Sequence, residues 1–285
     1  MIEIANQILT YIGMYFIIIA FPFALLVEGV RRKIYARMQN RRGPPILQAF
    51  YDIRKLAGKY KKIPKSLIFR IMPIAAIITA VVLFLFIPFS WISFQYDFIV
   101  FVYLFILLDT FYLVGALSSQ SPFSAQACAR DLLLMIGYEI VFMISAAAFL
   151  VGAGVTSISA YNSEFMFLSM PVASFILIYL GHIIVKVTPY DVVEAEPEIS
   201  GGLFTEYLGK NLALLEVAEF TKDLAFYVIA AMFIFGRAHL VWGAFLLMLW
   251  YTISKATSPR HSTFFSAKVF LLIALAAFIN LVVLV

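Results

Sequence analysis

Residues 67–89 read LIFRIMPIAAIITAVVLFLFIPF, a stretch of 23 residues in which Arg70 is the one charged side chain. A helix of this length crosses the ~30 Å hydrocarbon core of a bilayer. The whole chain has the same character, because 64% of its residues are hydrophobic, 13% are charged and the mean hydropathy is +0.98. The alternating pattern of an outer-membrane barrel is absent. We therefore expect an all-α integral membrane protein, with residues 1–285 forming a single membrane domain.

Seven further apolar segments are long enough to cross the membrane, which makes eight predicted transmembrane helices. The first segment lacks the basic start and small-residue cleavage site of a signal peptide, so it is expected to remain as a helix. The eight predicted spans are residues 6–27, 67–89, 98–117, 132–154, 165–187, 211–236, 238–254 and 266–285.

The distribution of Lys and Arg orients these spans, since cytoplasmic loops carry the excess of basic residues. Of 21 Lys and Arg, twelve lie between Arg31 and Lys65. This places the basic loop 31–66 and the loop 188–210 in the cytoplasm and both termini outside, in a multi-pass protein of the cell (plasma or inner) membrane. The net charge of +5 then follows from topology, and nothing beyond charge supports nucleic-acid binding.

The basic loop is predicted to contain an amphipathic interfacial helix. Apolar residues recur near a 3.6-residue period from Ile46 onward, after the break at Gly43-Pro44-Pro45. Two interpretations are open: a lipid-surface anchor or a docking surface for a soluble partner. The residues assigned to docking are Arg37, Arg41, Arg42, Gly43 and Pro44.

The sequence offers this chain no cofactor or metal site. Cys128 is its single cysteine, which excludes an internal disulfide and any cysteine-ligated iron–sulfur or zinc site. A Gly-rich phosphate loop is also absent. Any cofactor that the function requires is therefore expected in partner chains.

Acidic residues are concentrated in one region. Eight of the sixteen fall between Asp191 and Asp223, in a run that merges into an apolar helix. Carboxylates near a bilayer are costly and indicate a functional site, and buried acids that lie close together exchange protons near neutral pH. The chemistry that this run indicates is proton movement through Asp191, Glu194, Glu196, Glu198, Glu206, Glu216 and Glu219, with Asp223 in support.

Two more acids, Asp109 and Glu139, lie inside predicted spans at a similar depth, on the order of 10 Å from the cytoplasmic surface. On the sixth span Glu216, Glu219 and Asp223 share one helical face, which is expected to point into the protein.

The alternative is that these acids simply pair with cations and hold helices together. Cations available for pairing are Lys186, Lys210, Lys222 and Arg130. His182 is a supporting relay candidate, although a lone His is more often a satisfied interior residue.

The segments RMQNRRGPPILQAFYDIRKLAGK, ARDLLLMIGYE and PYDVVEAEPEISGGLFTEYLGKNLALLEVAEF resemble the membrane subunit at the heel of respiratory complex I and of energy-converting membrane-bound nickel-iron hydrogenases. The resemblance covers roughly residues 30–260. It implies a non-catalytic subunit that anchors a soluble redox arm and carries an acidic relay toward antiporter-like membrane subunits. Glu139, Arg130, Glu206, Glu219 and the acids of the 191–198 loop match the family's relay, whereas Glu216 and Asp109 have no counterpart in complex I.

Within this resemblance the chain favours the hydrogenase side. Its first loop reads Gln39-Asn40-Arg41-Arg42-Gly43, and Lys186 and Val187 stand where complex I usually carries an arginine. The resemblance implies hydrogenase-like large and small soluble subunits, which hold a nickel-iron centre and iron–sulfur clusters. It implies coupling of electron transfer to proton or sodium translocation. The alternatives are a quinone-reducing subunit of complex I type, a stand-alone secondary transporter and a passive anchor.

Overall fold

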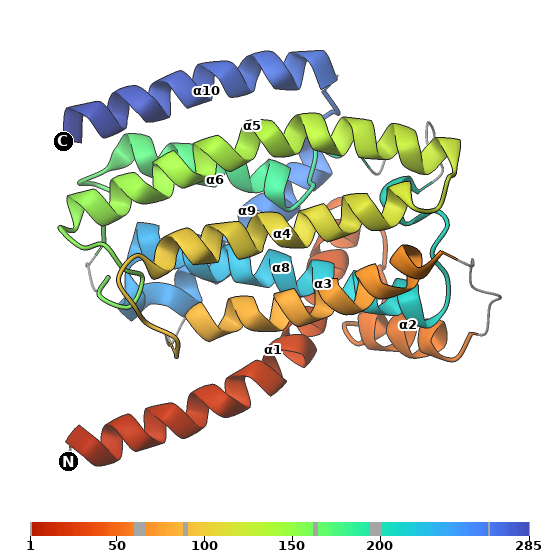
Figure 1. Ribbon diagram of the computed structural model, residues 1–285, viewed down its shortest axis with the longest axis horizontal. Helices are drawn as coiled ribbons and strands as arrows, with labels where there is room; N and C mark the ends of the chain where they lie inside the picture. The colour runs from red at the N-terminus through yellow and green to blue at the C-terminus, as the bar shows by residue number, and fades with distance from the viewer. Residues whose placement is uncertain are drawn as a thin grey trace.

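The computed structural model describes residues 2–59, 66–87, 91–161, 165–193, 201–261 and 263–284. In this part of the chain all regular structure is helical (Figure 1), which confirms the predicted all-α class. The elements are α1 (Ile2–Met38), α2 (Gln48–Ala57), α3 (Leu67–Phe86), α4 (Asp97–Leu117), α5 (Pro122–Gly152), α6 (Pro171–Ile184), η1 (Gly202–Phe204), α8 (Lys210–Phe235), η2 (Arg237–His239), α9 (Leu240–Thr257) and α10 (Thr263–Leu284).

Helix α8 forms the centre of the bundle. It packs against α1, α2, α3, α6 and α9, while α10 lies on the outside against α5 (Figure 1). Every residue from Thr221 to Ile234 is buried. Because this part of α8 is buried, its polar residues Lys222 and Asp223 must find their partners inside the protein.

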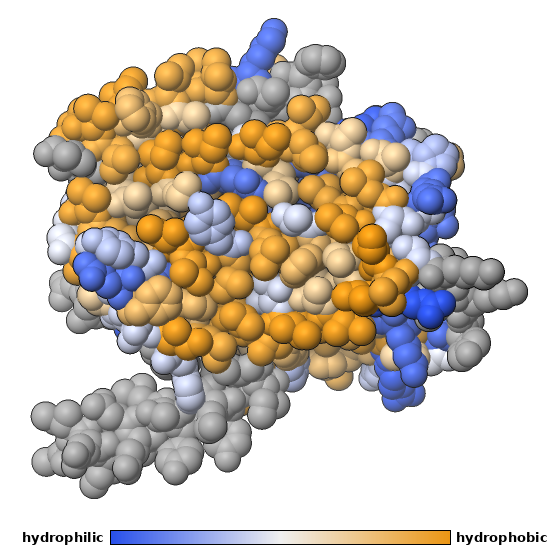
Figure 2. Space-filling model, viewed as in Figure 1, coloured by the Kyte–Doolittle hydropathy of each residue, from blue (hydrophilic) through white to orange (hydrophobic). Residues whose placement is uncertain are grey.

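Among the described residues, four helical segments are long and apolar enough to cross a membrane: Leu67–Phe86, Asp97–Leu117, Pro122–Gly152 and Arg237–Thr257. Two shorter apolar segments, Pro171–Ile184 and Leu271–Val283, accompany them. Figure 2 shows an apolar surface over α3, α4 and α5, with hydrophilic residues gathered at the end of the molecule where α2 lies. A membrane protein is expected to have such an apolar belt with a polar end.

Several helix boundaries differ from the prediction. Helix α1 continues to Met38, eleven residues past the predicted end at 27 and into the predicted basic loop 31–66, and the starts of α5 and α6 differ for a common reason. Helix α5 begins at Pro122, ten residues before the predicted start at 132, and α6 begins at Pro171 rather than 165. Proline is favoured in the first turn of a helix, because the missing N–H would have no partner there. The predicted helix of the first loop is present as α2, which runs from Gln48 to Ala57.

The first loop folds back tightly onto the bundle. Gly29 of α1 lies so close to the backbone carbonyl of Ile46 that a methyl group in its place would collide with it. Gly209, which has a φ of +64°, approaches the carbonyl of Lys59 in a similar way. These contacts bring α2 against α8 at the same end of the bundle as the α4–α5 connection and the segment after α6 (Figure 1).

Candidate functional site

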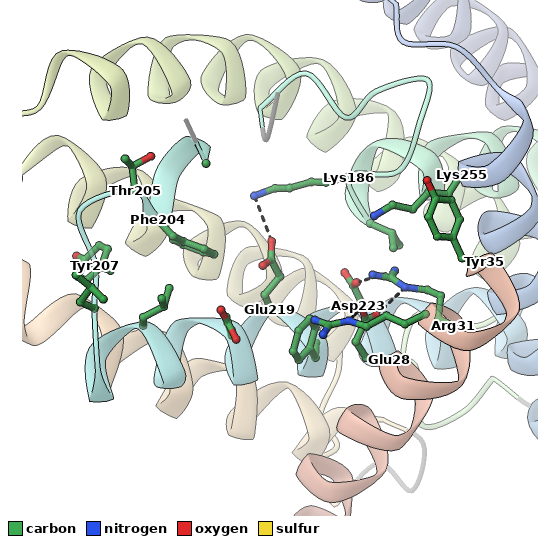
Figure 3. A pocket seen from close by; sticks show the side chains of 17 residues that line it. Glu28, Arg31, Tyr35, Lys186, Phe204, Thr205, Tyr207, Glu219, Asp223 and Lys255 are labelled. Atoms are coloured by element: carbon green, nitrogen blue, oxygen red, sulfur yellow. Dashed lines mark hydrogen bonds and ion pairs between the residues drawn. The ribbon is translucent and has the colours of Figure 1, made fainter. Parts of the chain in front are cut away.

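A cavity of about 700 Å³ lies where the C-terminal part of α1, the segment after α6 and the N-terminal half of α8 meet (Figure 3). Its lining mixes acids and bases in equal number, and the predicted acidic face of α8 points into it. The acids are Glu28, Glu216, Glu219 and Asp223, and the bases are Arg31, Arg32, Lys186 and Lys255. A cavity lined by this many charged groups is suited to hold water.

Arg31 connects α1 to α8 at one side of the cavity. Its guanidinium lies 2.7 Å from Glu28 and 3.4 Å from Asp223, and it also donates to the hydroxyl of Tyr227 at 3.4 Å. Arg32 pairs with Glu28 at 2.8 Å and with Asp52 of α2 at 2.9 Å. The cavity wall is therefore an ionic network that ties α1, α2 and α8 together.

Lys186 forms a second group of charges, which we call the Lys186 cluster: Lys186, Asp131 and Glu219. Figure 3 shows Lys186 reaching across the cavity from the segment after α6 toward Glu219 on α8. Its Nζ lies 3.6 Å from Glu219 Oε1 and 3.8 Å from Asp131 Oδ2 on α5. The same Nζ lies 5.7 Å from the centre of the Tyr112 ring. One ammonium thus serves two carboxylates at distances longer than a direct hydrogen bond.

A third group of charges lies deeper in the bundle, and we call it the Lys222 cluster: Lys222, Asp109 and Tyr138. Lys222 Nζ lies 2.5 and 2.6 Å from the two carboxylate oxygens of Asp109. The Tyr138 hydroxyl donates to the same carboxylate. The ammonium also lies 5.1 Å from the centre of the Phe105 ring, so this buried charge is satisfied by a carboxylate and an aromatic face.

Glu139 follows Tyr138 on α5 and lies beside the Lys222 cluster, where Asp109 and Lys222 act on it electrostatically. Its side chain is half-buried, and its buried Oε1 makes no hydrogen bond in the described part of the chain. A buried carboxylate oxygen without a partner is rare, because it gives up hydration without compensation. Glu139 therefore differs from Asp109, because the carboxylate of Asp109 is paired with the ammonium of Lys222.

Three contacts fix the start of the acidic loop, residues 188–193. Arg260 pairs with Asp191 at 3.0 Å, Thr188 donates to the carbonyl of Ser254 at 3.1 Å, and Arg130 donates to the carbonyl of Val192 at 3.3 Å. Burial and a hydrogen bond with Tyr179 raise the pKa of Tyr190 in this segment above its ordinary value. Further along, Glu206 is half-buried just before α8. The predicted relay residues Glu194, Glu196 and Glu198 lie outside the described residues.

Pairing accounts for several acids of the predicted relay. Asp109, Asp191, Glu219 and Asp223 each face a Lys or Arg within 4 Å, which is the alternative considered for individual residues. The sequence indicates Lys222 and Lys186 as available partners, but not Arg31 and Arg260. Asp109, Glu219 and Asp223 nevertheless face the interior of the bundle or its cavity from α4 and α8, whereas Asp191 and Glu206 lie in the segment between α6 and α8.

The remaining predicted residues fall into two groups. His182 is buried, with its ring nitrogens 3.0 Å from Ser254 Oγ and 3.1 Å from the carbonyl of Tyr179, as a satisfied interior histidine would be. The residues assigned to docking form an accessible surface at the C-terminal end of α1 and in the segment that follows it: Arg37, Arg41, Arg42 and Gly43 are exposed and Pro44 is half-buried.

Sequence reasoning missed Asp131, Tyr112 and Tyr138 as site residues. A signal for Asp131 was available, because it is a charged residue near the start of an apolar span and follows Arg130 directly. The two tyrosines gave no signal, since among 15 Tyr only their contacts with Lys186 and Asp109 distinguish them.

Comparison with known proteins identifies the family and its relatives. The family model described as NADH dehydrogenase matches residues 11–284. Hydrogenase-4 component C of Escherichia coli (strain K12) is 34% identical over 229 residues, which cover 75% of this chain and 72% of that protein. Formate hydrogenlyase subunit 4 of the same strain is 27% identical over 231 residues, covering 76% and 74% of the two chains.

The H subunit of the NADH-quinone oxidoreductase of Carboxydothermus hydrogenoformans is 28% identical over 257 residues, covering 83% of this chain and 73% of that protein. Among solved structures, a chain of the membrane-bound sulfane sulfur reductase, an archaeal respiratory membrane complex, superposes with a TM-score of 0.86. It covers 97% of this chain and 99% of its own length at 22% identity, so this likeness shows the shared fold.

Proposed function

The chain belongs to the NADH dehydrogenase family of membrane subunits, and on this premise we propose that it is a non-catalytic membrane subunit of a redox-driven ion pump of the hydrogenase or sulfur-reducing type. It anchors the soluble electron-transfer arm and carries an acidic relay that couples electron transfer to proton or sodium translocation. The family membership and the apolar helices make it a membrane protein. We also propose that the chain crosses the membrane eight times, with both termini outside the cell.

Two observations favour the hydrogenase type over a quinone-reducing type. The relative with 34% identity is named hydrogenase-4 component C, while the NADH-quinone oxidoreductase protein noted above is 28% identical. The cavity is lined by eight charged side chains, whereas small-molecule pockets for apolar ligands are lined mainly by apolar and aromatic groups. Such a lining suits water and protons better than a quinone ring with its apolar tail.

The relay runs from the cavity into the bundle. Protons enter the hydrated cavity at Glu216 and Glu219, pass the Lys186 cluster, reach the Lys222 cluster and arrive at Glu139. A change of charge at the cytoplasmic rim of the cavity shifts the balance between Lys186 and its two carboxylates, because charge interactions are strong inside the protein and weak in water. The observation that carries the proposal is the buried, partnerless Oε1 of Glu139 beside the matched Asp109–Lys222 pair, within the described part of the chain.

The partners follow from the same arrangement. Arg37, Arg41 and Arg42 present basic charge to a soluble hydrogenase-like subunit, and the half-exposed Glu139 side of α5 offers its proton to an antiporter-like membrane subunit. Electron transfer takes place in the soluble arm, where a nickel-iron centre and iron–sulfur clusters are expected. This chain contributes the protonation chemistry that follows.

The experiment is Glu139→Gln in the assembled complex, reconstituted in liposomes and driven by reduced viologen. Gln keeps the size and polarity of the side chain but removes its protonation, so we expect normal assembly, electron transfer within about twofold, and loss of ion uptake, measured with a pH-sensitive dye and with radioactive sodium. Lys268→Gln is the control, because it removes an exposed charge from α10, away from the cavity and the relay. Unchanged ion uptake in Glu139→Gln would leave a passive anchor as the function.

One observation favours the quinone-reducing alternative: the matched relatives include the H subunit of an NADH-quinone oxidoreductase. In that case the cavity between α1 and α8 would admit a quinone ring. Quinone reduction by the purified complex, inhibited by substituting Arg31 or Tyr35 at the cavity wall, would establish this alternative. Hydrogen evolution or sulfur reduction without quinone reduction would establish the hydrogenase or sulfur-reducing type.

A further inference from the structure

The Lys186 and Lys222 clusters share helices α5 and α8, and Tyr112 beside the Lys186 cluster lies on α4, the helix of Asp109. The two clusters are about one helical turn apart along α8. On α8, Glu219 belongs to the first cluster and Lys222, three residues later, to the second. On α4, Tyr112 lies beside Lys186 and Asp109, three residues earlier, pairs with Lys222. A separation of three residues is a rise of about 4.5 Å on one helical face. The two clusters are therefore close neighbours along these helices.

Tyr112 lies beside the Lys186 cluster and one helical turn along α4 from Asp109. Its ring is 1% exposed and lies beside the Lys186 ammonium on one side, and Phe204 of η1 packs edge-on against it at 5.4 Å. Three carboxylates act electrostatically on its hydroxyl: Glu219 of the Lys186 cluster, Asp109 of the Lys222 cluster, and Asp223. The hydroxyl therefore senses charge from both clusters.

Two buried polar atoms at these clusters lack a hydrogen bond. Neither the Tyr112 hydroxyl nor Asp131 Oδ2 makes one with any described residue, although Lys186 Nζ lies 3.8 Å from Asp131 Oδ2 as an ion pair. A hydroxyl both donates and accepts, and a carboxylate oxygen accepts. Buried polar groups of this kind are normally satisfied by internal water, which makes about three hydrogen bonds at such sites.

We propose that Tyr112 and Asp131 form an internal water site that joins the Lys186 cluster to the Lys222 cluster, with Tyr112 as the residue that positions the water. The hydroxyl keeps its own proton, donating one hydrogen bond and accepting another from water. A proton then moves along this water from the Glu219 side to the Asp109 side, with no net change in Tyr112. This inference rests on the proposed function, because it supplies the connection that the relay needs.

The test is Tyr112→Phe in the assembled complex in liposomes. The ring and its packing remain and the hydroxyl is lost, so we expect assembly and the midpoint of thermal inactivation to stay close to wild type, while the rate of coupled ion uptake falls at least about tenfold. Tyr161→Phe is the matched control: Tyr161 is also fully buried, but its hydroxyl donates to the carbonyl of Phe233 at 2.8 Å, away from both clusters. The control should transport at the wild-type rate.

A spectroscopic readout separates positioning from a structural role. We expect the reduced-minus-oxidised infrared difference spectrum to contain a protonated-carboxyl band that disappears in Glu139→Gln. In Tyr112→Phe the same band should appear at least about tenfold more slowly, and in Tyr161→Phe at the normal rate. Loss of transport in Glu139→Gln together with normal transport and a normal band in Tyr112→Phe would overturn the water site and keep the proposed function. Normal transport in Glu139→Gln would overturn the proposed function itself.

A second measurement covers the case in which Tyr112→Phe fails to assemble. A map of the wild-type complex at a resolution that shows water should contain density within hydrogen-bond distance of both the Tyr112 hydroxyl and Asp131 Oδ2. A map without such density, with either atom hydrogen-bonded to protein instead, would overturn the inference.

Discussion

Lys222 Nζ and the carboxylate of Asp109 are 2.5 and 2.6 Å apart across 113 residues of sequence, with 2% and 3% of their side chains exposed. Bringing two charges into an apolar interior carries a large desolvation cost, which close contact and further hydrogen bonds offset. The Tyr138 hydroxyl and the face of Phe105 provide those further contacts. The pair therefore depends on both of its members.

Removing one member of this pair is expected to be more harmful than removing both. Asp109→Asn or Lys222→Met alone leaves an uncompensated buried charge, which costs about 3–5 kcal/mol. The double variant Asp109→Asn/Lys222→Met should recover most of that loss. The measurement is the temperature of half-inactivation of the purified complex for the four proteins of the cycle. If the loss of thermal stability in the double variant equals the sum of the losses in the two single variants, the two side chains are not coupled.

The Arg260–Asp191 pair is expected to behave differently, because 40% of the Arg260 side chain is exposed. Exposed pairs contribute about 0–1 kcal/mol, so Arg260→Gln should leave thermal stability nearly unchanged. It should, however, accelerate amide hydrogen exchange in the segment 188–193, which this pair holds at one end. Lys268→Gln, which removes an exposed charge from α10, serves as the control. Equal exchange in the two variants would show that Arg260 does not hold the segment.

The helices and the acidic face of α8 were predictable because they depend on local sequence. Apolar length marks the spans, and the i, i+3, i+7 spacing of Glu216, Glu219 and Asp223 places them on one face, which lines the cavity. Boundaries were less accurate where tertiary structure extends a helix beyond its apolar part, as in the first ten residues of α5. Those residues include polar side chains that no hydropathy pattern assigns to a helix.

The pairings were not predictable, because each one joins helices that are far apart in sequence. Nothing near Lys222 selects Asp109 on α4 over the acids within its own helix, and nothing near Asp131 points to Lys186. In the sequence, the cations of α1 and of the α9–α10 segment also lie far from the acids that they pair with. Packing brings Arg31 to Asp223 and Arg260 to Asp191. More of the acids are therefore paired with a Lys or Arg than the composition of the acidic region indicates.

The close approach of α1 and the first loop gives a prediction about assembly of the cavity wall. In Gly29→Ala the added methyl group would meet the backbone carbonyl of Ile46, which cannot move without displacing the loop. We expect a loss of about 1–3 kcal/mol, as for other overpacked sites. Gly58→Ala is the matched control, since a methyl group there finds ordinary contacts of 3.7 Å. The readout is the temperature of half-inactivation, and similar values for both variants would contradict the tight packing.

The exposed arginines after α1 give a prediction that separates docking from membrane anchoring. Arg41 and Arg42 are both exposed in the segment that joins α1 to α2, and they make no ion pair with any described residue. Arg41→Glu/Arg42→Glu reverses the local charge without disturbing a helix. A docking surface predicts that this variant inserts into the membrane normally but loses the soluble subunits on affinity purification.

Ionic strength provides the decisive comparison for this variant. Charges on an exposed surface are screened within about 10 Å at 0.1 M salt, so docking of the wild-type chain should also weaken as salt rises, whereas insertion of the apolar helices should not. The outcome expected for a pure lipid anchor is different: the variant would retain its soluble subunits but bind less tightly to vesicles rich in anionic lipid. Retention of the soluble subunits at every salt concentration would assign Arg41 and Arg42 to the bilayer surface instead of to a partner protein.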